Sequence, residues 1–254
     1  MTVTHHTEGH VGLITLDRPE KRNALNAAMI DGIVHGLLAH EENPEVRVIV
    51  LTATGEKAFC AGMDLTRVGG STEGSPAPRP ETATYLRLIQ EGSTKPLIAA
   101  VNGTAVAGGF ELVLACDLVI AADHALFGLP EVARGLVAGA GGTFLPLRIP
   151  RAVAFELALT ALPINAARAY ELGLVNRVVP GDAVLASALE LAHAVAANSP
   201  NAVRVTRGLL RDASELATAE AWERVNAAIP GVLESPDARE GSRAFLEKRP
   251  ANWA

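Results

Sequence analysis

A chain of 254 residues, 49% hydrophobic and 20% charged, can form one large domain with a substantial core or two small ones. Its net charge of −6, with no basic run, disfavours a nucleic-acid partner. The N-terminus lacks a signal-peptide pattern and no apolar run reaches the roughly 18 residues of a membrane helix, so we expect a cytoplasmic protein without a membrane partner.

The cysteines and the N-terminal histidines predict no metal site. Cys60 and Cys116 lie in apolar surroundings without metal-ligand spacing, which favours buried free thiols and a reducing compartment. His5, His6 and His10 crowd the N-terminus, and we interpret that stretch as solvated or fraying rather than metal-binding.

The first third of the chain predicts a strand, a helix and a second strand. Residues 10–19 form an apolar run that ends in a proline turn, which is typical of a strand. Residues 26–42 carry apolar residues at helical spacing, with Asn26 as the N-cap. The β-branched run 46–54 suits a strand covered on both faces, so these elements indicate an α/β protein.

The middle of the chain continues this alternation after a long loop. Residues 68–80 are rich in Gly, Ser and Pro and form either a flexible surface loop or a flap beside a site. A helix is expected over 82–92, a strand over 95–103, a helix from Gly109 to Cys116, and two short strands within 117–131.

The last part of the chain is predicted to be mostly helical from Gly139 onward. A short strand at 176–180 interrupts it, and helices then continue to the end. Strands therefore come first and helices last, and the helical tail is expected to form a separate lobe or an oligomer interface.

Two glycine-bearing turns predict a pair of open backbone N–H groups. They span Phe59–Leu65 and Val106–Leu112, and each follows a predicted strand. Two such turns on neighbouring strands can aim two donors at one oxygen, as in an oxyanion hole. From spacing alone, tight glycine packing explains such a turn more often than an oxyanion hole does.

Two carboxylates are candidates for acid–base chemistry. Glu111 begins a helix within an apolar run, and Glu131 follows a proline after the next strand, so the fold can bring them together. Paired carboxylates beside an apolar cleft have their pKa values pushed apart, which makes one an acid and the other a base. Taken singly, each is also an ordinary carboxylate at a helix start.

Other catalytic motifs are absent from the sequence. No serine-hydrolase elbow and no phosphate-binding P-loop occur, and the glycines at 139–142 do not match the dinucleotide fingerprint.

The motifs together resemble the crotonase superfamily, the enoyl-CoA hydratase/isomerase group, over nearly the whole chain. The matching stretches are LDRPEKRNALN, AFCAGMDL, AVNGTAVAGGFELVLACDLVIA, FGLPEVARGLVAGAGG, ALTALPINAARAYELGLVNRVVP and FLEKRPANW. The resemblance implies a spiral of turns of two strands and a helix over residues 1–195. It also implies a helical oligomerisation region over 196–254, and a homotrimer or dimer of trimers.

The resemblance also implies the reaction and its residues. The oxyanion amides fall on Met63 and Gly108, and the two glutamates needed by hydratases fall on Glu111 and Glu131. The substrate is an acyl-CoA thioester, so no separate cofactor is expected. Residues that match CoA- or substrate-binding positions are Arg22, Ala24, Ala61, Gly62, Asp64, Gly139 and Lys248.

Some of these positions have other interpretations. Lys248 resembles a lysine that reaches the CoA phosphate from a neighbouring subunit, but a solvated charge fits as well. Asp64 is typical of a turn or cap rather than of a catalyst. Ala107 replaces the first of three glycines common before the catalytic helix, and Ala138 stands where proline is common.

The predicted activity is therefore hydration of a 2-enoyl-CoA. The alternatives are a carnitinyl-CoA type dehydratase, an enoyl-CoA isomerase and a non-catalytic acyl-CoA-binding protein. Acyl chain length does not follow from the sequence.

Overall fold

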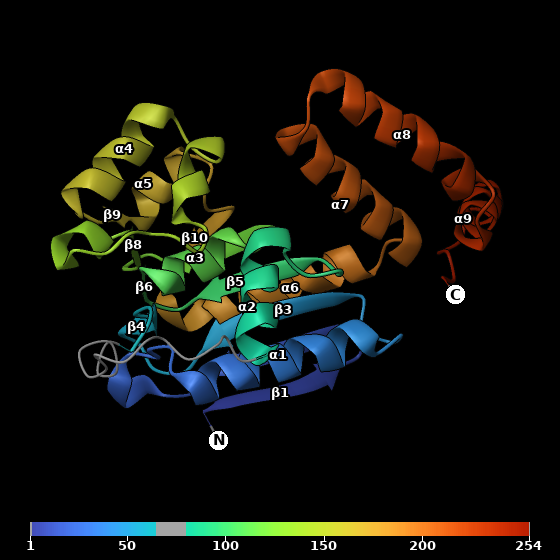
Figure 1. Cartoon of the computed structure of the whole chain (residues 1–254). Coiled ribbons are helices and arrows are strands. Elements are labelled where there is room, and N and C mark those ends of the chain that lie inside the picture. Colours follow the sequence, from blue (N-terminus) through green and yellow to red (C-terminus); the bar gives the residue numbers. More distant parts are fainter. Residues whose placement is uncertain (1, 65–79, 254) are drawn as a thin grey trace.

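The computed structural model describes residues 2–64 and 80–253, which form a mixed α/β structure (Figure 1). Within these residues the larger sheet has the strand order β1-β2-β3-β5-β7-β10. Its strands are β1 Val3–Glu8, β2 Val11–Leu16, β3 Val48–Ala53, β5 Leu97–Val101, β7 Leu118–Ala122 and β10 Arg177–Val179. β1 pairs antiparallel with β2, and the later neighbours pair in parallel. The predicted α/β class is confirmed.

A smaller sheet has the order β4-β6-β8-β9 within the same described part of the chain. Its strands are β4 Ala58–Cys60, β6 Thr104–Val106, β8 Leu126–Gly128 and β9 Ile164–Asn165. β4, β6 and β8 directly follow β3, β5 and β7, so the chain passes from one sheet to the other once in each turn of a spiral. A helix completes the turns after β4 and β6.

The helices follow the predicted distribution, alternating with strands in the first part of the chain and continuous at its end. The α-helices are α1 Ala27–Glu42, α2 Pro80–Glu91, α3 Gly108–Leu114, α4 Arg151–Thr160, α5 Ala166–Glu171, α6 Val184–Ala196, α7 Pro200–Glu215, α8 Thr218–Leu233 and α9 Pro236–Glu247. The short 3-10 helices are η1 Pro19–Lys21, η3 Glu131–Arg134, η4 Gly142–Leu147 and η5 Gly181–Ala183. The predicted cap of α1 is confirmed, because the Asn26 side chain accepts from the Met29 N–H at 2.9 Å.

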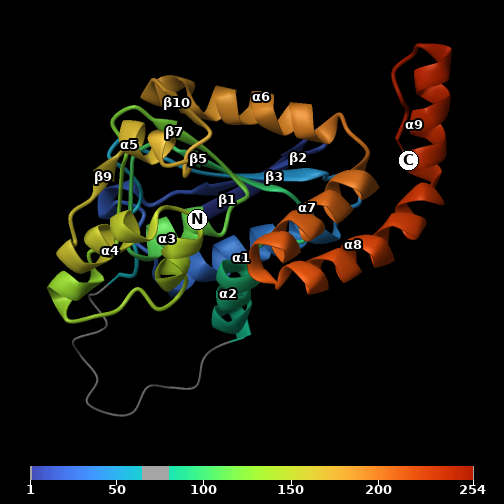
Figure 2. The same ribbon diagram turned by 90° about the horizontal axis from the view of Figure 1, so that it is seen from above.

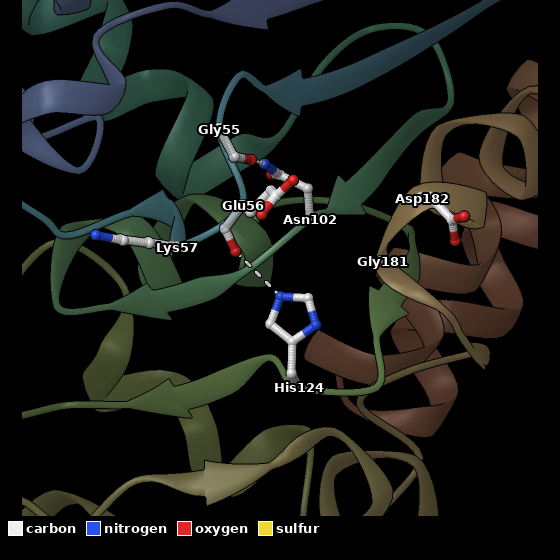
Figure 3. Close-up of a pocket in the computed structure, with 7 residues that line it drawn as sticks. All are labelled: Gly55, Glu56, Lys57, Asn102, His124, Gly181 and Asp182. Carbon is white, nitrogen blue, oxygen red and sulfur yellow. Dashed lines mark hydrogen bonds between the residues drawn. The ribbon is translucent and has the colours of Figure 1, made fainter.

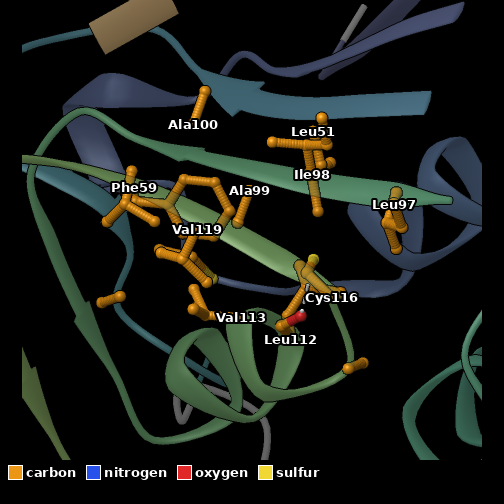
Figure 4. Packing of buried hydrophobic residues seen from close by; sticks show 14 of the residues in the cluster. Leu51, Phe59, Leu97, Ile98, Ala99, Ala100, Leu112, Val113, Cys116 and Val119 are labelled. Carbon is orange, nitrogen blue, oxygen red and sulfur yellow. Dashed lines mark hydrogen bonds between the residues drawn. The ribbon is translucent and has the colours of Figure 1, made fainter. Parts of the chain in front are cut away.

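The core lies around the parallel strands of the larger sheet. Every residue of β3 and β5 is buried, as the run 46–54 predicts for its strand. Figure 2 shows α6 and α1 on opposite faces of this sheet. Close-up packing includes Leu51, Ile98 and Val119 from the sheet together with Phe59 and Leu112 (Figure 4). This apolar burial holds β4 and α3 firmly beside each other.

The N-terminal segment is exposed at His5 and His6, as one of its two predicted alternatives has it, but it does not fray. Residues 3–8 do not form a fraying stretch but the edge strand β1, hydrogen-bonded to β2 along its length. The His5 ring lies 5.5 Å, centroid to centroid, from the rings of both His35 and His40 on α1. Imidazole rings pack against one another as other aromatic rings do, so a segment rich in histidines can still form a strand.

The section that follows Gly139 also differs from its prediction. Residues 139–150 were expected to be helical, but only the short helix η4 forms there. Two backbone N–H groups of this section, those of Ala140 and Gly142, donate to the Glu111 carboxylate instead of to helix carbonyls. A side-chain acceptor therefore replaces the helical hydrogen bonds.

The three last helices project from the body of the molecule (Figures 1 and 2). The C-terminal segment packs against the residues just before α7, where the Trp253 indole N–H donates to the Ala197 carbonyl at 2.8 Å. Arg47 donates to the neighbouring Ala196 carbonyl at 3.2 Å. The division into 1–195 and 196–254 stays a prediction.

The remaining expectations concern the cysteines, membrane-spanning helices and the loop at 68–80. Cys60 and Cys116 are buried free thiols, as predicted. Among the described residues, no helix is long and apolar enough to cross a membrane. The loop at 68–80 lies outside the described residues, except for Pro80, which begins α2.

Candidate active site

The first glycine turn lies where β4 ends. It is held against the residues before α1, because Leu25 N–H donates to the Gly62 carbonyl at 2.8 Å and Asp64 N–H donates back to Leu25 at 2.9 Å. These bonds leave the Met63 N–H pointing away from Leu25, and within the described part of the chain it donates to no acceptor.

The second glycine turn lies at the start of α3, directly against the first. A methyl group built on Gly62 would lie 2.6 Å from the Ala107 Cβ and 3.0 Å from the Gly108 nitrogen, so glycine alone permits this approach. A methyl group on Gly108 would lie 3.7 Å from the Met63 nitrogen. Because Gly108 is the first helical residue, its N–H has no intrahelical acceptor. Two open N–H groups therefore lie side by side.

The first turn of α3 also carries Glu111, whose side chain is only 5% exposed. Its Oε1 accepts two hydrogen bonds, from Ala140 N–H at 3.0 Å and Gly142 N–H at 2.9 Å. Oε2 accepts none from the described residues. Two backbone donors compensate the desolvation of the carboxylate and hold it in one orientation, which leaves Oε2 for a ligand.

Glu131 is the first residue of η3, placed there by the turn at Pro130. Its Oε2 is buried and has no hydrogen-bond partner among the described residues. Burial raises the pKa of the Glu131 carboxyl above its ordinary value, and the nearby Glu111 carboxylate raises it further. The Glu111 carboxyl is therefore held by N–H donors, whereas the surroundings of the Glu131 carboxyl favour its protonated form more than those of an ordinary glutamate.

The predicted CoA-binding segments also meet. Ala61 N–H donates to the Arg22 carbonyl at 3.0 Å, which joins the segment 22–25 to the segment 61–64. Asp64 forms an ion pair with Arg18 at 2.7 Å, and the same Arg18 nitrogen donates to the Ala24 carbonyl at 3.2 Å. Asp64 therefore supports the turn, in agreement with its interpretation as a turn residue.

Two other predicted residues lie in different surroundings. Gly139 lies on the exposed turn that holds Glu111, with its N–H donating to Val137 at 2.9 Å. Lys248 caps the C-terminal end of α9 in the left-handed conformation and is exposed. Because α9 projects away from α3 (Figure 1), this chain does not bring its own Lys248 to the glutamates.

Several residues that shape the site were not predicted. Asn23 is fully buried, donates to the Thr54 and Ala58 carbonyls and accepts from Arg18 N–H, so it fixes the segment before α1. A lone asparagine between Arg22 and an apolar run gives no sequence signal for this role. Tyr85 on α2 is also buried near Glu111, and helical spacing alone marks it only as a core position.

A separate hollow of about 510 Å³ opens where strands of the larger sheet end. Figure 3 shows His124 there, with its ring hydrogen-bonded to the Glu56 carbonyl at 3.1 Å. That bond is the main cause that raises the pKa of His124. Glycines and charges of both signs line the hollow, and it shares no residue with the site of Glu111 and Glu131.

Comparison with solved structures shows the class of fold. The chain is similar to the crystal structure of an enoyl-CoA hydratase from Mycobacterium tuberculosis, with a TM-score of 0.90 and 40% sequence identity. The match covers 100% of this chain and 98% of that one. The fold is the crotonase fold.

Sequence comparison shows the family. The model of the family described as enoyl-CoA hydratase/isomerase matches residues 6–254. A carnitinyl-CoA dehydratase from Proteus mirabilis is 39% identical over 97% of this chain and 96% of its own length. A mevalonyl-coenzyme A hydratase from Aspergillus fumigatus is 40% identical over 96% of this chain and 91% of its own length. The chain belongs to the enoyl-CoA hydratase/isomerase family.

Proposed function

We propose that this protein is an enoyl-CoA hydratase, which reversibly adds water across the 2,3 double bond of a 2-enoyl-CoA thioester. One observation carries the proposal. The buried Glu111 carboxylate and the Glu131 carboxyl, whose pKa is raised, lie in one site beside two open N–H groups. Hydration needs a base for water, an acid for carbon and a donor pair for the thioester oxygen, and the site offers all three.

The open N–H groups of Met63 and Gly108 bind the thioester carbonyl oxygen. Negative charge develops on this oxygen as the enolate forms, and each preorganised donor contributes about 10²–10³-fold to the rate. Only backbone atoms take part, so the exposed Met63 side chain does not interfere with this role.

The two glutamates then divide the proton transfers. Glu111 Oε2 accepts a proton from the water that attacks Cβ, while Oε1 stays bound to Ala140 and Gly142. Glu131 delivers its proton to Cα, and its raised pKa favours the protonated form that this step needs. Dehydration runs the same steps in reverse.

The CoA moiety binds along the joined segments 22–25 and 61–64. Arg22, Ala24, Ala61, Gly62 and Asp64 offer mainly backbone groups there. No cofactor besides the CoA of the substrate takes part in the proposal.

A homotrimer or dimer of trimers completes the site. Lys248 then reaches the CoA phosphate of a neighbouring protomer, since α9 projects away from its own site. Exposed apolar side chains on the projecting helices support this assembly, among them Trp222, Leu233 and Phe245, the last 83% exposed. Molar mass in solution tests the assembly.

A dehydratase for a substituted acyl-CoA is the second candidate. It uses the same two glutamates, and two of the relatives above are named for carnitinyl-CoA and mevalonyl-CoA. Many isomerases of the family lack one or both glutamates, and an acyl-CoA-binding protein needs neither. The presence of both glutamates therefore disfavours these two.

A substrate panel tests the proposal. Purified protein is mixed with crotonyl-CoA, a longer 2-enoyl-CoA and carnitinyl-CoA, and the absorbance of the conjugated thioester is followed. Gain or loss of this absorbance identifies the reaction. Binding of every thioester with turnover of none would show that the hydratase proposal is wrong and favour the binding protein.

A further inference from the structure

One buried hydroxyl beside the proposed active site has no partner. Tyr85 lies on α2, its side chain is 5% exposed, and its hydroxyl oxygen is buried without a hydrogen bond among the described residues. Leaving a buried hydroxyl unpaired costs about 1–3 kcal/mol, so such groups are rare unless a ligand uses them.

The position of α2 places this hydroxyl at the acyl end of the site. Ile89, one helical turn after Tyr85 and on the same face of α2, lies 3.0 Å from a methyl group built on Gly141. The Glu111 Cβ lies 3.8 Å from the same point. This face of α2 therefore covers the turn that holds Glu111.

The packing of α2 against α3 also brings the phenol toward the first turn of α3. Burial raises the pKa of Tyr85, and the Cys60 thiol and the Glu111 carboxylate raise it further. Cys60 packs under the start of α3, since a methyl group on Gly109 would overlap the Cys60 carbonyl. The hydroxyl therefore lies beside the oxyanion turn and the catalytic carboxylate, and it is neutral and able to donate.

We infer that Tyr85 determines substrate specificity by hydrogen-bonding an oxygen substituent that the acyl chain carries next to Cβ. The inference rests on the proposed function, because Glu111 marks the place of Cβ. An acyl chain with a hydroxyl at C4 restores the missing hydrogen bond, whereas a plain alkyl chain leaves it unmade.

The variant Tyr85→Phe tests this by removing only the hydroxyl. Its kcat/KM is compared with that of the unmodified protein on crotonyl-CoA and on 4-hydroxycrotonyl-CoA. The unmodified protein is expected to favour the hydroxylated substrate about tenfold, the value of one neutral hydrogen bond, and the variant to lose this preference. Tyr170→Phe, at the only other tyrosine and 56% exposed, is the matched control and keeps the preference.

A binding experiment separates this inference from the proposed reaction. Calorimetry compares butyryl-CoA with 4-hydroxybutyryl-CoA, which bind without reacting, and the same tenfold difference is expected to disappear in Tyr85→Phe. If no enoyl-CoA is hydrated but this difference holds, the hydratase proposal fails and the role of Tyr85 stands.

Two kinetic results would overturn the inference. One is an equal loss on both substrates, which would assign the hydroxyl to the attacking water or to the fold. The other is an unchanged preference in the variant. A melting temperature well below that of the unmodified protein would also contradict it, because an unpaired hydroxyl contributes no stability to the free protein.

Discussion

Replacing Glu111 by glutamine separates the chemical role of this residue from its structural role. The carboxylate Oε1 accepts from the Ala140 and Gly142 N–H groups, and the glutamine carbonyl oxygen can accept the same two bonds. The glutamine nitrogen then takes the place of Oε2, where a donor replaces the proton acceptor that the attacking water needs.

The expected magnitudes differ for activity and stability. Loss of a general base lowers kcat for crotonyl-CoA hydration by about 10²–10⁴-fold. Both hydrogen bonds persist but lose their charge assistance, so the free energy of unfolding changes by only about 1 kcal/mol. Affinity for a saturated acyl-CoA stays near that of the unmodified protein.

Glu111→Ala is the matched contrast. It leaves the buried Gly142 N–H and the Ala140 N–H without acceptors, at a cost of about 1–3 kcal/mol each in unfolding free energy. Turnover, calorimetric binding and urea unfolding of both variants give the comparison. Near-normal turnover of Glu111→Gln would refute the assignment of Glu111 as base.

Three further predictions concern backbone strain and protonation. Ala107 has φ 53° and ψ −132°, so Ala107→Gly is expected to raise the free energy of unfolding by up to about 1 kcal/mol, measured in urea; a loss of stability would contradict the strain. Burial lowers the pKa of His40 in the folded protein below its ordinary value of 6.5. The neutral His40 side chain therefore contributes its full stability above the pKa of the unfolded chain, and this contribution is lost as the pH falls through the lower pKa of the folded protein. Unfolding midpoints measured in steps from pH 7.5 to 4.5 should show this loss, and His40→Gln should flatten it. The raised pKa of Glu131 predicts that kcat/KM for hydration declines as pH rises through that value, and a profile that instead rises through this range would argue against Glu131 as the acid.

The sequence predicts a structural feature well where that feature depends on the residues of a single strand or helix. The apolar run 46–54 predicts a strand buried on both faces, and β3 is one. Asn26 predicts a helix cap through its own side chain, and it makes that bond. Such features depend on residues close in the chain, so the residue pattern is sufficient.

Features that depend on distant partners were predicted less well. The strand β1 was missed because its histidines find their packing partners on α1, about thirty residues later. Residues 139–142 were expected to be helical, yet the N–H groups of Ala140 and Gly142 donate to a carboxylate 29 and 31 residues earlier. The orphan hydroxyl of Tyr85 belongs to this class as well.

The strand order β1-β2-β3-β5-β7-β10 follows the order of the chain without any insertion. Each new parallel strand therefore joins an edge that is already present, and no earlier pair has to open to receive it. During synthesis from the N-terminus, the sheet can grow one spiral turn at a time as the chain emerges. The proposed acid–base pair needs Gly142, which emerges after β7 but before β10, so every residue of the pair is present while the larger sheet still lacks its last strand.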